Sequence, residues 1–115
     1  MQFMLLIQGD EAYLPDTAGT GPIGPEYKAY TEAMQKAGVW ITGDRLKTTH
    51  HAARVRVRDG KSVVLDGPYV DAKEQVGGYY IIDVPTMSDA IDWAARCPAA
   101  PFGTIEVRPF AEVPR

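Results

Sequence analysis

The stretch Phe3-Met4-Leu5-Leu6-Ile7-Gln8 is apolar at five consecutive positions before it ends in glutamine. A short, uninterrupted apolar run is typical of a strand that is covered on both of its faces. Helices packed on one side of a sheet shelter only alternate side chains, because successive side chains of a strand point to opposite faces. The stretch therefore predicts a strand whose second face is also covered.

Two helix patterns lie further along the chain. The first follows Pro25, repeats apolar side chains at Tyr27, Tyr30, Met34 and Ala37, and stops at Gly38. The second begins at Thr86, whose spacing to Asp89 resembles a capping box, and ends before Pro98. Its predicted apolar stripe consists of Met87, Ala90, Ile91, Ala94 and Ala95.

Strand patterns separate and surround these helices. They cover residues 39–41 (interrupted at Gly43-Asp44), 53–58, 62–65, 78–84 and 104–110. Asp59-Gly60 is a strong hairpin signal between the second and third of these. Strict alternation in 53–58 predicts a half-buried strand with Arg54, Arg56 and Arg58 on one face.

The resulting order is strand-helix-strand, a hairpin, then strand-helix-strand. Two such units predict an α+β, ferredoxin-like fold in which an antiparallel sheet carries both helices on one face. We expect a single domain over residues 1–115. Because the apolar run needs cover on its second face, we expect two copies to pack sheet to sheet as a homodimer, a dimeric α+β barrel.

Composition narrows the class of protein. Twelve basic and 15 acidic side chains leave a formal net charge of −3 without a polybasic run, which argues against nucleic acid or an anionic membrane as the main partner. Cys97 is the only cysteine, so an internal disulfide is excluded. The N-terminal residues lack a basic leader, and no apolar stretch approaches the roughly 20 residues that cross a bilayer. We expect a cytoplasmic protein.

A further set of residues carries a family resemblance. The set comprises Met4 to Ile7, Gly43-Asp44 with Leu46, Val55-Arg56, the block Asp66-Gly67-Pro68-Tyr69 with 73–80, Ala90 to Ala95 with Cys97-Pro98, and Glu106 to Pro109. From about residue 1 to 111 the chain resembles the DGPF subgroup of the YCII-related proteins, with Tyr69 where phenylalanine is usual. The resemblance implies a dimeric α+β barrel in a family whose biochemistry is mostly unassigned. Some branches resemble lactone dehalogenases, some carry a His–Asp pair suspected of acid–base work, and some adjoin sigma-factor-like regulators.

The segment from Asp66 to Glu74 holds the predicted catalytic residues. Glycine and proline make a rigid turn of Asp66 to Tyr69, in which Asp66 either caps the turn or acts as a general base. Lys73 and Glu74 are either a solvated pair or the groups that bind and protonate an anionic substrate. Tyr69 is a candidate ligand contact within the same turn.

Three residues elsewhere complete the predicted ligand-binding set: Tyr80, Arg108 and His51. Arg108 suits an anion, and Tyr79 or Tyr80, but not both, can line a given cavity because they face opposite ways. His50-His51 alone make no metal site; a metal would need Asp44 as a third ligand. We therefore expect no metal.

Two further motifs favour ordinary structural roles. Residues 19–24 match G-x-G-x-x-G, but they do not directly follow a strand and Pro22 removes a backbone N–H, so no nucleotide cofactor is expected. The three strand arginines form a basic ribbon that is more typical of a solvated face than of DNA contact.

These observations leave three functions open. The first is binding of a small anionic, partly unsaturated or aromatic metabolite near the turn 66–69, with cofactor-free acid–base catalysis. The second is a non-catalytic regulatory or protein-interaction module that uses its hairpin for contact. The third is a metal-dependent enzyme. Whether the chain is an enzyme at all stays open at this point.

Overall fold

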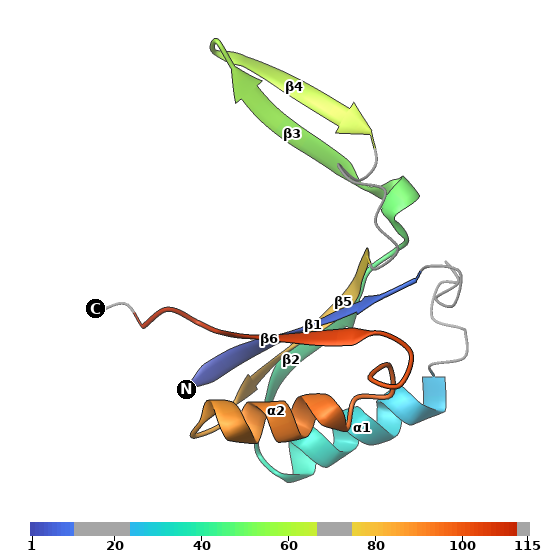
Figure 1. Ribbon diagram of the computed structural model, residues 1–115, viewed down its shortest axis with the longest axis vertical. Helices are drawn as coiled ribbons and strands as arrows, with labels where there is room; N and C mark the ends of the chain where they lie inside the picture. The colour runs from blue at the N-terminus through green and yellow to red at the C-terminus, as the bar shows by residue number, and fades with distance from the viewer. Residues whose placement is uncertain (11–23, 67–74, 113–115) are drawn as a thin grey trace.

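The computed structural model describes residues 1–10, 24–66 and 75–112 of the chain. Strands β1 (Gln2–Gly9), β2 (Trp40–Arg45), β5 (Gln75–Asp83) and β6 (Thr104–Pro109) form one antiparallel sheet in the order β2-β5-β1-β6. Helices α1 (Gly24–Lys36) and α2 (Met87–Ala95) lie on one side of this sheet (Figure 1). The predicted ferredoxin-like α+β fold is confirmed.

Strand β1 lies between β5 and β6, and its burial alternates along its length. Phe3, Leu5 and Ile7 are buried against the helices, whereas Met4 and Leu6 are half-buried on the other face. From β5 the core adds Tyr80 and Ile82, and from the helices Tyr30, Met34 and Ala90. The apolar run is thus covered on one face within a single chain.

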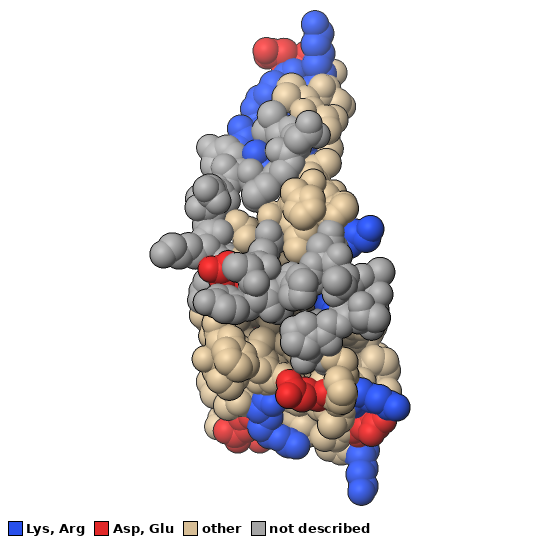
Figure 2. Space-filling view, turned by 90° about the vertical axis from the view of Figure 1, so that its right-hand side faces the viewer, with Lys and Arg blue, Asp and Glu red and all other residues tan. Residues whose placement is uncertain are grey.

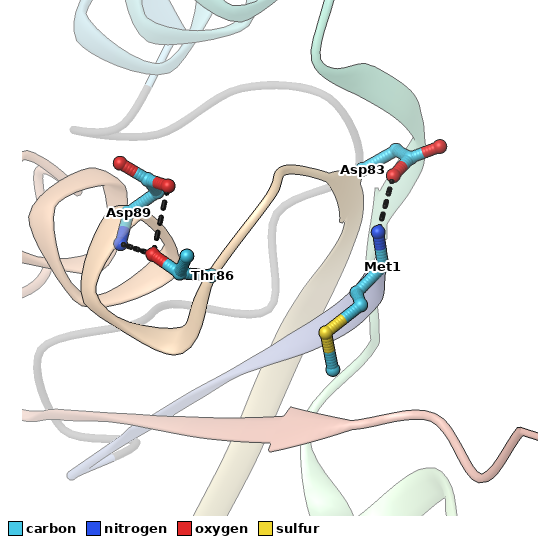
Figure 3. Close-up of polar contacts among 4 residues, drawn as sticks. All are labelled: Met1, Asp83, Thr86 and Asp89. Atoms are coloured by element: carbon cyan, nitrogen blue, oxygen red, sulfur yellow. Dashed lines mark hydrogen bonds and ion pairs between the residues drawn. The ribbon is translucent and has the colours of Figure 1, made fainter.

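Local signals begin and end the helices. After α1, Gly38 adopts φ +75°, and the N–H groups of Gly38 and Val39 donate to the carbonyls of Gln35 and Met34. This Schellman arrangement ends the helix and turns the chain into β2. At the start of α2, the Thr86 hydroxyl oxygen accepts the Asp89 N–H at 3.2 Å and donates to the Asp89 carboxylate at 2.8 Å (Figure 3), so the predicted cap is confirmed.

A second, two-stranded sheet consists of β3 (Ala53–Arg58) and β4 (Lys61–Asp66). Asp59 and Gly60 both have positive φ, 53° and 75°, as a type I′ hairpin turn requires. The hairpin projects away from the four-stranded sheet on the side opposite the helices in Figure 1. The predicted hairpin is confirmed, and it forms a sheet separate from the four-stranded one.

Three expectations about individual elements were wrong. Strand β2 continues through Gly43 and Asp44 to Arg45, because β5 pairs with both residues. On β3 the valines are more exposed than Arg54 and Arg56, so the predicted half-buried apolar face is absent there. On α2, Met87, Ile91 and Ala95 are exposed, and Trp93 packs against the core beside Ala90 and Ala94.

Candidate functional site

The predicted catalytic segment begins at the end of the hairpin. Asp66 is the last residue of β4, with Ala53 as its cross-strand partner. Tyr69, Lys73 and Glu74 lie outside the described residues, which resume at Gln75 in β5. The roles assigned to these four residues therefore stay predictions.

Tyr80 belongs to the helix-covered face of the sheet. Its ring meets the Tyr30 ring edge-on at a centroid distance of 5.4 Å, and its hydroxyl lies 3.2 Å from the Thr31 hydroxyl. Burial is the main cause that raises the pKa of Tyr80. Tyr80 contributes mainly to packing in the single chain, with its hydroxyl already hydrogen-bonded.

Tyr27, Tyr30 and Cys97 surround the same region of the core. The Tyr30 hydroxyl donates to the Trp93 carbonyl at 2.6 Å, and the Cys97 sulfur lies 4.0 Å from the Tyr27 hydroxyl. Burial raises the pKa of Tyr27, Tyr30 and Cys97. These groups stay protonated at neutral pH, and Cys97 packs in the core as expected.

Arg108 lies on the opposite, helix-free face of the sheet. Arg108, on β6, is the cross-strand partner of Met4 on β1, and the Met4 side chain points away from the helices. The Arg108 Nε lies 3.7 Å from Glu106 Oε2, but the two side chains are 71% and 45% exposed. An ion pair this exposed contributes at most about 1 kcal/mol, so Arg108 can exchange Glu106 for another anion at little cost.

His51 lies at the foot of the hairpin, in the short 3-10 helix η2 (Thr49–His51). Its ring lies against the His50 ring at a centroid distance of 4.5 Å and a tilt of 37°, and the Thr48 hydroxyl lies 3.0 Å from His50 Nδ1. Asp44 Oδ1 accepts the Arg45 N–H at 2.8 Å. Within the described ranges, no three His, Cys, Asp or Glu side chains converge as a metal site.

The helix-free face, which we call the open face, brings together residues that were not grouped in the sequence. Strand pairing aligns two rows across the sheet. The rows are Asp44-Tyr79-Leu6-Glu106 and Thr42-Ile81-Met4-Arg108. The four central side chains are half-buried and mostly apolar, and the outer four are exposed. The open face therefore has an apolar centre, from Met4, Leu6, Tyr79 and Ile81, with a charged rim.

The structure thus separates some predicted site residues and adds others. Arg108 and Tyr80 lie on opposite faces of one sheet, so one cavity within the chain cannot hold both. Tyr79 is the tyrosine that shares a face with Arg108, and Glu106 lies on the same face, two residues before Arg108 on β6. The sequence did contain a signal for the face on which Tyr79 lies. Asp83 follows Ile81 and Tyr79 at intervals of two residues on β5, so the three side chains share a face, and a carboxylate is expected on the face without helices.

The fold and this face define a ferredoxin-like α+β protein with an open sheet. The chain belongs to the YCII family: a family model described as the YCII-related domain matches residues 1–114. An uncharacterised protein of Rhizobium meliloti (strain 1021) is similar, with 41% identity over 69 residues. That match covers 58% of this chain and spans about half, 56%, of the relative's length. None of the described helices is both long and apolar enough to pass through a lipid bilayer.

Proposed function

We propose that the chain forms a homodimer in which the open faces of two sheets enclose a small anionic metabolite with an apolar or aromatic body. The carrying observation is the position of Arg108 next to the apolar centre of the open face. A largely apolar surface with one convergent cation is the usual composition of a site for such a ligand.

The apolar centre supports the proposed dimer. Met4, Leu6, Tyr79 and Ile81 are only half-buried in the single chain. Covering a large apolar side chain completely stabilises a protein by about 1.5–3 kcal/mol relative to full exposure, so a second sheet gains about half of that for each one. This gain favours sheet-to-sheet packing over an open face in water.

Within the rim, Arg108 supports the choice of an anion. Arg108 binds a carboxylate through two parallel hydrogen bonds, while Tyr79 offers a ring for stacking and a hydroxyl as donor. Asp66, Lys73 and Glu74 are the proposed acid–base groups, with Asp66 as general base; Tyr69 and His51 are proposed ligand contacts. The proposed chemistry is proton transfer on an enolate-like or carboxylate substrate and uses no cofactor.

A thermal-shift screen against small aromatic and unsaturated carboxylates tests binding. We expect the ligand-induced rise in Tm to be lost in Arg108→Met and partly kept in Arg108→Lys. Lys36→Met, which removes an exposed cation at the end of α1, is the control for net charge. An unchanged shift in Arg108→Met sinks the assignment.

Catalysis requires a separate experiment. Asp66→Asn keeps the size of the side chain and removes its basicity. For a general base we expect turnover per folded molecule to fall at least about a hundredfold while Tm stays near that of the wild type. A large loss of Tm with unchanged turnover per folded molecule makes Asp66 a turn residue.

One observation favours a second candidate, the non-catalytic interaction module. The hairpin β3–β4 projects from the body and exposes several valines. If no carboxylate shifts the Tm of the wild type while the hairpin proves essential for assembly, the interaction module is the better account.

A further inference from the structure

The hairpin formed by residues 53–66, which we call the arm, is a two-stranded sheet set apart from the main one. A two-stranded hairpin without further packing is marginally stable in water. The arm nevertheless has a regular ladder of six cross-strand pairs, from Ala53 with Asp66 to Arg58 with Lys61. A second surface that packs against the arm would stabilise this hairpin.

One face of the arm is apolar and uncovered in the single chain. Val55, Val57 and Val64 are 63%, 60% and 62% exposed. Val55 and Val64 are direct cross-strand partners, and Val57 follows two residues after Val55 on the same face. These three residues form a contiguous patch, the valine face.

The opposite face of the arm is basic. It carries Arg54, Arg56, Arg58 and Lys61 around the exposed Val63, and Figure 2 shows blue side chains gathered along the upper part of the molecule. With Asp59 and Asp66, the segment 53–66 has a net charge of +2. Since the whole chain has −3, the other residues together carry −5. The net charge of the arm is therefore opposite in sign to the net charge of the other residues of the chain.

We infer that the arm of each copy reaches onto a second copy of the chain and packs its valine face there, in a reciprocal, two-fold arrangement. The arm points to the side of the sheet opposite the helices (Figure 1), which is the side where the proposed dimer places the partner. The arm's net charge of +2 favours its approach to a partner chain whose other residues together carry −5. This inference rests on the proposed homodimer and adds a second contact to it.

Analytical ultracentrifugation of Val55→Asp/Val64→Asp tests the inference. We expect the dimer dissociation constant to rise about tenfold or more, because two carboxylates would enter an apolar contact. Met87→Asp/Ile91→Asp, which places the same charges on the exposed face of α2, is the matched control and should dimerise as the wild type does. Wild-type affinity in the arm variant overturns the inference.

Hydrogen exchange of the wild-type arm is the second measurement, and it does not depend on the folding of a variant. We expect arm amides to be protected at concentrations where the dimer forms and to lose protection on dilution. Protection that is independent of concentration means that the arm packs on its own chain. Protection that appears only with added duplex DNA identifies a nucleic-acid partner. Either result, or no protection at all, overturns the inference.

Leu6→Asp separates this inference from the proposed dimer. It should abolish dimerisation through the open face and deprotect the arm. If Leu6→Asp dissociates the dimer while the arm variant leaves it intact, only the arm contact fails. If the wild type is monomeric at all concentrations, the proposed dimer and the arm contact fail together. The thermal-shift experiment with Arg108→Met then decides whether the chain still binds an anionic metabolite.

Discussion

In the main sheet and in the arm, successive side chains of a strand point to opposite faces, yet only the main sheet has a covered face. In β1, Phe3 and Leu5 are fully buried because two helices pack against that side. In β3, Val55 and Val57 alternate in the same way, but about three fifths of each side chain remains exposed. Alternation shows which side chains share a face; it does not supply the surface that covers them.

The largest expected effect is a cavity in the covered face. Leu5→Ala should lower the free energy of unfolding by about 2–5 kcal/mol, because Leu5 is fully buried at the centre of the sheet. Chemical denaturation measures this loss. A loss below about 1 kcal/mol would mean that the core can close around the missing side chain.

The second prediction concerns the close contact between β2 and β5. A Cβ on Gly43 would lie 2.5 Å from Tyr80 Cδ1 and 2.9 Å from the Tyr79 carbonyl oxygen. Gly43→Ala should therefore destabilise the protein by about 1–3 kcal/mol. Gly24→Ala, at a position with no neighbour within 4 Å, is the control and should leave Tm unchanged or slightly raised.

The third prediction is that alkaline solution destabilises the protein through the buried tyrosines on the helix-covered side of the sheet. Burial raises the pKa of Tyr27, Tyr30 and Tyr80 above the usual value of about 10. Above that value the unfolded chain releases these protons while the folded chain holds them, so unfolding becomes more favourable as pH rises. Denaturation between pH 8 and pH 11 measures the slope as a function of pH. Tyr30→Phe should flatten it.

The fourth prediction concerns the N-terminus of α2. Thr86→Ala removes the acceptor for the Asp89 N–H and should cost about 1 kcal/mol. Ser88→Ala, at an exposed position of the same helix, is the control. Equal Tm values for the two variants would show that water replaces the cap.

The smallest expected effect is in the arm. In the monomeric Leu6→Asp background, Val57→Ala should change the free energy of unfolding by less than about 0.5 kcal/mol, since Val57 is exposed there. Chemical denaturation beside Leu5→Ala measures the contrast. A loss above about 1 kcal/mol would mean that the arm packs against its own chain.

The candidate site was predictable in part. Residue types pointed to Arg108 as an anion holder, and the order of elements placed it on an edge strand. Which tyrosine shares a face with Arg108 depends on the register between β5 and β1. That register puts Tyr79 beside Leu6 and Tyr80 beside Leu5. A shift of one residue in that register would exchange the two tyrosines, so the open face required the sheet itself.

The sequence by itself determined the local elements: the Asp59-Gly60 turn, the Thr86 cap, the end of α1 at Gly38 and the α+β order. Each of these follows from the preferences of a few neighbouring residues and needs no distant contact. Only the tertiary structure decided which face of each strand the helices cover, that β2 runs on to Arg45, and that the arm stands apart with its valines exposed. Those outcomes depend on contacts between segments far apart along the chain, to which local preference and periodicity are blind.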